Sequence, residues 1–161
     1  MSRFRLQIGG RIDRDRPLRF TFDGREYRGY EGDTLASALL ANGVHQVATS
    51  IKHGRPRGIM AAGTEEPNAL VQIEKPFPEP MQTATTVRLA DGLEATGLPG
   101  QGRLATDPDP ARYDSMHAHC DVLVVGAGPA GLAAALTAAR SGARVIVADA
   151  DTEFGGALLG S

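Results

Sequence analysis

The stretch that decides the fold is Val122-Leu123-Val124-Val125-Gly126-Ala127-Gly128-Pro129-Ala130-Gly131. Its four consecutive apolar residues predict a buried strand, because the strands of a parallel sheet are covered on both faces. A glycine-rich turn follows at once and opens an Ala-rich helix that ends near Arg140, and Val145-Ile146-Val147 then predicts a second strand. This order is the first βαβ unit of an α/β Rossmann dinucleotide-binding domain, which we place at residues 120–161.

Each glycine of the turn has a steric task. Gly126 permits the tight turn, Gly128 lets the backbone approach a pyrophosphate, and Gly131 allows the helix to pack close to the strand. The phosphates would lie at the helix N-terminus, where unpaired N–H groups and the helix dipole favour anions. A glycine-rich turn without a ligand is the alternative interpretation. The candidate cofactor-binding residues here are Gly126, Gly128, Pro129, Ala130 and Gly131.

Asp149 closes the second predicted strand at the spacing expected for an acid that accepts hydrogen bonds from an adenosine ribose. Ala150 and Asp151 follow it, so a 2′-phosphate would meet carboxylates instead of an arginine. NADP is therefore disfavoured, and NAD and FAD remain open. Gly155 and Gly156 are further candidates that could keep the backbone close to the diphosphate, although a flexible turn explains them equally well.

The first part of the chain predicts a hairpin and a helix. Asp23-Gly24 is a type I′ turn signal between alternating segments, so residues 18–30 predict a β-hairpin. Asp33 can cap a helix over residues 34–42, and Gly43 offers the left-handed conformation that ends it.

Further strands are expected after that helix because the sequence is rich in β-branched and apolar residues at 44–50, 69–74 and 83–89. Together these elements predict a small α+β domain over residues 16–95. Residues 96–119 contain Gly-Leu-Pro-Gly-Gln-Gly and Asp-Pro-Asp-Pro, which predict a linker.

Composition excludes several classes of protein. The 161 residues are 42% apolar with a formal net charge of -2, which favours a soluble folded chain. Basic residues are scattered among acids, so no nucleic-acid footprint is expected. No run reaches the roughly 18 to 20 apolar residues of a membrane helix, and residues 1–17 lack a signal-peptide core. We therefore expect a cytoplasmic protein without membrane contacts. Few residues follow the second strand, so either the sequence is an N-terminal fragment or the rest of the dinucleotide-binding domain lies elsewhere.

No catalytic or metal centre is identified from the residues alone. His117, His119 and Cys120 offer three potential ligands, but a fourth ligand and a firm scaffold are missing, so no metal site is predicted. Cys120 is the only cysteine, which excludes an internal disulfide. The segment Arg55-Pro56-Arg57-Gly58 could bind phosphate or a partner's carboxylates through its guanidinium groups. A charged surface loop is the commoner explanation.

Taken together, these stretches resemble the N-terminal part of the alpha subunits of bacterial heterotetrameric sarcosine oxidases. The resemblance covers nearly the whole chain, and its glycine motif is common to many flavoproteins. The matching stretches run from Phe22-Asp23-Gly24 to Leu39-Leu40-Ala41-Asn42-Gly43, and include Arg55-Pro56-Arg57-Gly58-Ile59, Glu65-Glu66-Pro67-Asn68-Ala69-Leu70-Val71 and Asp121 to Gly131.

The resemblance implies a β-grasp, ferredoxin-like fold for residues 16–95. Relatives carry a [2Fe-2S] cluster on cysteines in the loop after the helix, whereas residues 50–69 contain no cysteine here. Because such a cluster needs thiolate or comparable ligands, we expect a domain without an iron–sulfur cluster. The family also associates NAD with this Rossmann site, with FAD as the alternative.

The resemblance further implies a complex with beta, gamma and delta subunits that contains FAD and FMN. Such a complex oxidises sarcosine to glycine, reduces oxygen and passes a one-carbon unit to tetrahydrofolate. The present chain alone is expected to be inactive. Two alternatives remain open: a non-catalytic β-grasp interaction module with an incomplete Rossmann tail, and the alpha subunit of an opine or proline dehydrogenase, which should show cluster cysteines.

Overall fold

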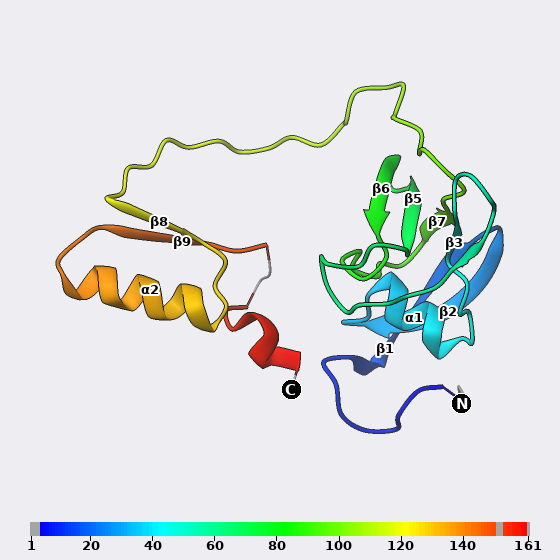
Figure 1. Cartoon of the computed structure of the whole chain (residues 1–161), viewed down its shortest axis with the longest axis horizontal. Coiled ribbons are helices and arrows are strands. Elements are labelled where there is room, and N and C mark those ends of the chain that lie inside the picture. The colour runs from blue at the N-terminus through cyan, green and yellow to red at the C-terminus, as the bar shows by residue number, and fades with distance from the viewer. Residues whose placement is uncertain (1–3, 151–152, 161) are drawn as a thin grey trace. The chain divides into compact units, whose positions relative to one another are not determined.

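The computed structural model describes residues 4–150 and 153–160, which form two compact units divided after Pro110 (Figure 1). The first unit holds a mixed five-stranded sheet in the order β2-β1-β7-β5-β6 and one helix. Its elements are β1 (Asp13–Phe22), β2 (Arg25–Glu31), α1 (Leu35–Ala41), β3 (Ala48–Thr49), β4 (Pro56–Arg57), β5 (Leu70–Lys75), β6 (Glu79–Thr83) and β7 (Leu93–Gly97).

The hairpin turn between β1 and β2 has the predicted geometry. Asp23 has φ +48° and Gly24 has φ +74°, and positive φ at both central positions defines the type I′ turn. β1 also forms a parallel pair with β7, and β7 forms an antiparallel pair with β5. The buried face of the sheet and α1 form the core, whose largest fully buried apolar side chains are Phe20, Phe22, Leu35, Leu39, Val47 and Val71.

The start of α1 differs from the prediction. Thr34, and not Asp33, is the N-cap: its hydroxyl accepts the Ser37 N–H at 3.1 Å, and the Ser37 hydroxyl accepts the Thr34 N–H at 3.0 Å. The Asp33 carboxylate is unavailable because it binds the Arg5 guanidinium, with nitrogen–oxygen distances of 3.0 and 2.7 Å. Gly43 has φ +79° and ends the helix as predicted.

The strand predicted at residues 83–89 is wrong. Only Thr83 belongs to a strand, and the rest of this segment turns over the start of α1. The Ala84 carbonyl accepts the Ala36 N–H at 2.9 Å, and the Val87 carbonyl accepts the Leu35 N–H at 2.8 Å. These carbonyls therefore satisfy the first-turn donors of a helix instead of a strand ladder.

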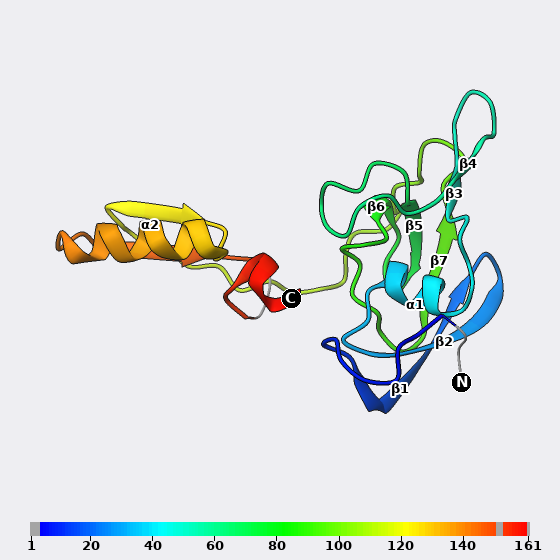
Figure 2. The same ribbon diagram turned by 60° about the horizontal axis from the view of Figure 1, so that its bottom comes forward.

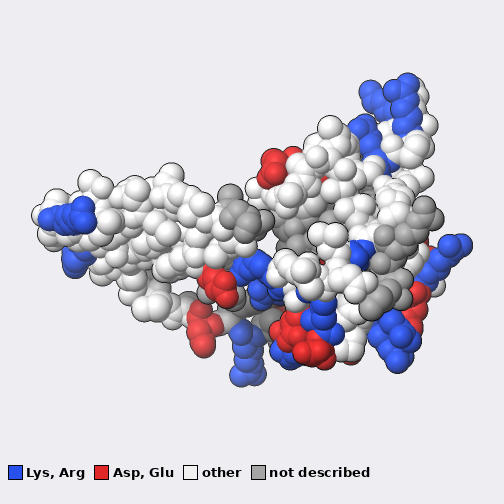
Figure 3. All heavy atoms as spheres, turned by 90° about the horizontal axis from the view of Figure 1, so that it is seen from below, with Lys and Arg blue, Asp and Glu red and all other residues white. Residues whose placement is uncertain are grey.

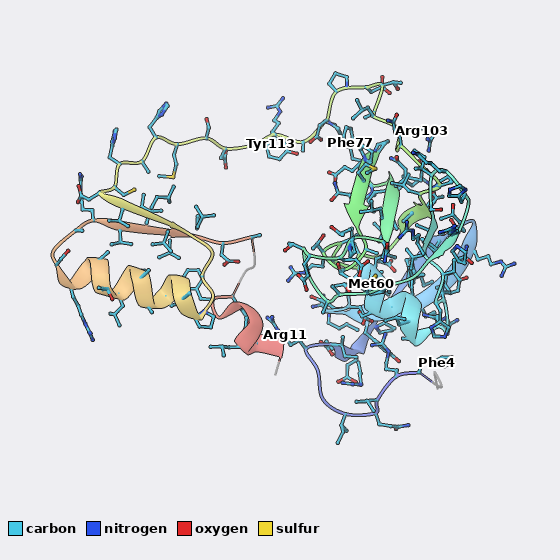
Figure 4. The ribbon with its side chains drawn as sticks, in the orientation of Figure 1. Phe4, Arg11, Met60, Phe77, Arg103 and Tyr113 are labelled. Carbon is cyan, nitrogen blue, oxygen red and sulfur yellow. The ribbon has the colours of Figure 1, made fainter. Side chains whose placement is uncertain are left out.

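The sheet of the first unit holds the chain beyond residue 95. β7 extends to Gly97, and the Arg103 N–H then donates to Oε1 of the buried Gln72 at 2.7 Å. The Arg103 guanidinium, labelled in Figure 4, also pairs with both oxygens of Glu74 at 2.5 and 2.6 Å. The predicted linker is thus attached to the sheet at its start, through β7 and Leu98, and again at Arg103.

The second unit contains β8 (Val122–Val125), α2 (Pro129–Arg140), β9 (Val145–Ala148) and the 3-10 helix η1 (Gly156–Gly160). β8 and β9 are parallel, and α2 crosses between them and packs on one side of their sheet (Figure 1). The predicted strand–helix–strand order is therefore observed. β8 is less buried than predicted, with Leu123 58% and Val125 81% exposed, because a single helix packs on this two-stranded sheet.

In the part of the chain that the structure describes, no helix is long and apolar enough to cross a membrane.

Candidate functional site

The glycine-rich turn joins β8 to α2 in a conformation that only glycine adopts readily. Gly126 has φ +100° and donates its N–H to the Ala148 carbonyl at 2.8 Å, which ties the turn to the end of β9. Gly128 is the N-cap of α2, and Pro129 occupies the first helical position, where its missing N–H costs nothing. Ala130 follows as an exposed residue of the first helical turn.

Gly128 borders open space. A Cβ placed on Gly128 would meet no atom within 4 Å, although its backbone is in an ordinary extended conformation, with φ -71°. A glycine is therefore not required there by the chain's own packing. The space beside the N-terminus of α2 is free for another molecule.

Gly131 has the opposite environment. A Cβ on Gly131 would collide with the carbonyl oxygen of Gly126 and lie 3.3 Å from Cγ1 of Val124. The helix therefore approaches the strand and the turn closely enough to exclude any side chain.

Gly131→Ala is expected to destabilise the second unit by about 1 to 3 kcal/mol, because a methyl group would push against backbone that cannot yield without moving the turn. Ala134→Gly removes a methyl from an exposed position of the same helix and should cost only about 1 kcal/mol. Denaturant unfolding followed by circular dichroism measures both. A Gly131→Ala chain as stable as wild type would contradict the close packing.

Asp149 lies directly after β9, and its Oδ2 accepts the Ala127 N–H in the centre of the turn. The spacing along the sequence predicts that this carboxylate accepts hydrogen bonds from an adenosine ribose. In the structure it is bonded to the turn itself, which it helps to hold against the end of β9. Asp151 lies outside the described residues.

The Gly155-Gly156 pair packs against the same turn. The Gly155 N–H donates to the Ala127 carbonyl at 2.9 Å, and a Cβ on Gly156 would lie 3.0 Å from the Cα of Gly128. Both glycines have positive φ, +138° and +53°. The structure thus brings the predicted residues Gly126, Gly128, Pro129, Ala130, Gly131, Asp149, Gly155 and Gly156 together around one helix N-terminus.

Sequence reasoning missed a buried carboxylate in the first unit. Glu66 is 3% exposed and accepts four backbone N–H groups: Met60 and Ala61 donate to Oε2, both at 2.6 Å, and Asn68 and Ala69 donate to Oε1 at 2.7 and 3.0 Å. Burial alone would raise the pKa of Glu66, but the four N–H donors together hold the pKa below its ordinary value.

The histidines near Cys120 form no ligand cluster. His117, His119 and Cys120 lie on a segment without regular structure that precedes β8, and no group of three His, Cys, Asp or Glu side chains placed to hold a metal ion occurs within residues 4–150 and 153–160.

Two protein-family models match this chain. Residues 15–98 match the 2Fe-2S iron-sulfur cluster binding domain, and residues 121–161 match the FAD binding domain.

Among curated proteins, the chain is 53% identical to the sarcosine oxidase subunit alpha of Corynebacterium sp. (strain U-96), over 93% of the chain and 16% of that protein. It is 43% identical to the sarcosine oxidase subunit alpha of Rhizobium meliloti (strain 1021), over 99% of the chain and 21% of that protein. The chain thus spans about a sixth to a fifth of the length of these relatives.

A solved structure, L-proline dehydrogenase from P. horikoshii, aligns with 89% of this chain and 26% of its own. The TM-score is 0.58 and the sequence identity is 24%, which establishes a similar fold.

The family matches correct two expectations about cofactors. Residues 15–98 belong to a 2Fe-2S cluster binding family, which contradicts the prediction of a domain without an iron–sulfur cluster. Residues 121–161 match an FAD binding family, so FAD replaces NAD as the dinucleotide to which this segment is related.

The side chains of this chain do not by themselves supply the ligands of a [2Fe-2S] cluster. A [2Fe-2S] cluster is held by four thiolates, or by two thiolates and two histidines. The only cysteine of the sequence, Cys120, lies outside residues 15–98, and the described residues hold no group of three potential ligands. In that region, the four N–H groups around Glu66 already bind the Glu66 carboxylate.

Three observations indicate the same ancestry: the small domain with its mixed sheet, the glycine turn at the start of α2, and the sequence identities over most of the chain. The chain belongs to the 2Fe-2S iron-sulfur cluster binding domain family through residues 15–98, and over most of its length it is a homologue of the sarcosine oxidase alpha subunit.

Proposed function

We propose that this chain is the N-terminal portion of the alpha subunit of a flavin-dependent sarcosine oxidase, and that its glycine turn holds the pyrophosphate of FAD. The observation that carries the proposal is the open space beside Gly128 at the N-terminus of the twelve-residue helix α2. The match of residues 121–161 to the FAD binding family supports the identity of the dinucleotide.

The residues of this chain would bind the diphosphate through backbone groups. The first N–H groups of a helix have no acceptor within the helix, and the positive end of its dipole lies beside them. The Ala127 N–H is occupied by Asp149, so the donors left for phosphate oxygens are those of Gly128, Ala130 and Gly131. Because Gly128 has no side chain, these donors can be reached at hydrogen-bond distance.

Asp149 then has a positioning role within the site. Its bond to the Ala127 N–H and the bond from Gly126 to the Ala148 carbonyl fix the first half of the turn to the end of β9. Gly155, bonded to the Ala127 carbonyl, fixes the turn from the other side. A turn held in this way is preorganised for a ligand and loses little freedom when the ligand binds.

The Rossmann fold of the second unit and the β-grasp fold of the first unit are part of the same proposal. The parallel β8-α2-β9 arrangement supports the first βαβ unit of a Rossmann domain, in which ligands bind at the carboxyl ends of the strands. The mixed sheet packed on α1, with β1 parallel to β7 between antiparallel neighbours, supports a β-grasp fold for the first unit.

In the complete enzyme, FAD would supply the capacity to accept electrons from the amine. We propose that the complex also contains beta, gamma and delta subunits, FMN and tetrahydrofolate as the one-carbon acceptor. Support comes from the homology to proteins named as alpha subunits of sarcosine oxidase. The residues described in this chain contribute binding and positioning, and none is assigned to the chemical step.

The experiment is to express the complete subunit with its partner subunits and to follow oxygen consumption. Sarcosine is expected to drive oxygen uptake with production of glycine, and proline at the same concentration is expected to give no uptake. Proline-dependent oxygen uptake without a response to sarcosine would contradict the proposed substrate and favour proline as the amine that is oxidised.

A further inference from the structure

The segment that leaves β3 and runs through β4 carries a group of exposed basic side chains. Lys52, His53, Arg55 and Arg57 occur within six residues, and all four are exposed. We call the segment from Ser50 to Arg57 the basic loop. In Figure 2 it extends away from the strands of the first unit, beyond β3 and β4.

Among the residues that the structure describes, Lys52 and Arg55 have no acidic partner in a salt bridge or side-chain hydrogen bond. Arg57 donates to the amide oxygen of Asn68 at 2.6 Å, which orients its guanidinium without cancelling its charge. In Figure 3, a group of Lys and Arg side chains at the upper edge of the view has no Asp or Glu beside it.

The backbone of the basic loop is held in one conformation. Ser50 bonds both sides of it: its N–H donates to the Arg55 carbonyl at 2.9 Å, and its hydroxyl accepts the Arg55 N–H at 3.0 Å. The Gly54 N–H also donates to the Ser50 carbonyl at 2.9 Å. The cations of this loop therefore project from a hydrogen-bonded backbone, which lowers the backbone entropy lost when a partner binds them.

An exposed apolar side chain lies within the same loop. Ile51 is 68% exposed, next to Lys52. Arginine is enriched where proteins contact one another, and a partner that binds the arginines of this loop would also cover Ile51.

From these observations we propose that the basic loop docks onto an acidic surface of a partner subunit. The proposal rests on the proposed function only in that it needs a multi-subunit enzyme. Charge complementarity identifies the partner's chemistry: carboxylates on its surface would meet Lys52, Arg55 and Arg57, with Ile51 in an apolar contact. Such pairs at the rim of an interface steer association and make its rate depend on salt.

The test is the double variant Lys52→Glu/Arg55→Glu of the complete subunit. Its matched control is Arg25→Glu/Arg28→Glu, which makes the same change in net charge at two exposed arginines of β2 that take part in none of the salt bridges above. The association rate with the partner subunits is measured by surface plasmon resonance at low and high ionic strength.

At low salt the loop variant should associate at least about tenfold more slowly than wild type, and the difference should shrink as salt is added. The control should stay within about threefold of wild type. Equal rates for the loop variant and wild type, or equal slowing of loop variant and control, would overturn the proposal. The proposal would also be overturned if the loop variant assembled as wild type does but no longer bound inorganic phosphate. The loop would then be a binding site for a small anion.

Failure of this inference is distinguishable from failure of the proposed function. A complex that oxidises sarcosine and assembles independently of the loop rejects only the docking proposal. A complex whose assembly depends on the loop but which does not oxidise sarcosine supports the docking proposal and rejects the assigned substrate.

Discussion

Glu66→Gln is expected to destabilise the chain by about 2 to 6 kcal/mol, because two of the four N–H groups that now meet carboxylate oxygen would face an amide NH₂ group. The amide has nearly the size of the carboxylate. The lost stability therefore comes from changed hydrogen bonding and not from a change in side-chain volume. Unfolding by urea at pH 7 gives the change in the free energy of unfolding. The neighbouring Glu65→Gln, at an exposed position, should lie within about 0.5 kcal/mol of wild type.

The pH dependence separates the charge of Glu66 from its shape. Because the folded-state pKa of Glu66 is lower than its ordinary value of 4.5, the ionised carboxylate stabilises the fold above pH 4.5. This contribution disappears as the pH falls from there through the folded-state pKa. The difference between wild type and Glu66→Gln should therefore be largest near neutral pH and shrink in acid. A difference that is independent of pH, or smaller than about 0.5 kcal/mol at pH 7, would contradict the assignment.

Arg5→Ala is expected to cost about 3 to 5 kcal/mol, because it leaves the Asp33 carboxylate buried without its cation. The Asp33 side chain is 0% exposed and receives two nitrogens of Arg5 at 3.0 and 2.7 Å. Tyr30 N–H and the Ser37 hydroxyl also donate to it, at 2.9 and 2.7 Å. These two bonds are too few to compensate for a lost bidentate ion pair.

Chemical denaturation of three variants measures this effect. Arg14→Ala removes a partly exposed arginine whose hydrogen bonds are solvent-exposed and reach only carbonyls of the same N-terminal segment, and should cost less than about 1 kcal/mol. Asp33→Asn combined with Arg5→Ala should be more stable than Arg5→Ala alone, because the buried group is then uncharged. A double variant less stable than Arg5→Ala would show that the charge of Asp33 is not the source of the loss.

Features coded by neighbouring residues could be predicted from the sequence. Asp23-Gly24 set the type I′ turn because positive φ at both positions is a local requirement. The apolar run, glycine turn and Ala-rich helix likewise predicted β8, α2 and β9 nearly to the residue. The glycine turn and the start of α2 lie within this segment, so the placement of Gly126 to Gly131 around one helix N-terminus followed from the same pattern. The bonds of Asp149 and Gly155 to Ala127 come from residues beyond β9 and were not predicted.

Features decided by distant residues could not be predicted. β7 was missed because its short sequence, Leu-Glu-Ala-Thr-Gly, becomes a central strand only through pairing with β1 and β5. Asp33 had a cap-like position, but its partner Arg5 lies 28 residues away. For Glu66, the Glu-Glu-Pro-Asn sequence did not indicate which carboxylate turns inward, since the four donors depend on the path of the surrounding loop.

The central claim is that the space beside Gly128 receives the pyrophosphate of FAD. Gly128→Val places a branched side chain in that space, where the chain itself has no atom within 4 Å of the added Cβ. The substitution should therefore block the ligand while costing the fold little. Ala139→Val, at an exposed position in the last turn of α2, is the matched control because it adds the same kind of side-chain bulk far from the turn along the helix.

The direct measurement is calorimetric titration of FAD into the flavin-free complete subunit, with thermal melting of each variant to verify folding. Wild type and Ala139→Val are predicted to bind FAD with equal affinity. Gly128→Val is predicted to bind it at least about a hundredfold more weakly, a loss of roughly 2.7 kcal/mol, with an unchanged melting temperature before FAD is added. Binding of FAD by folded Gly128→Val with the affinity of wild type would contradict the claim.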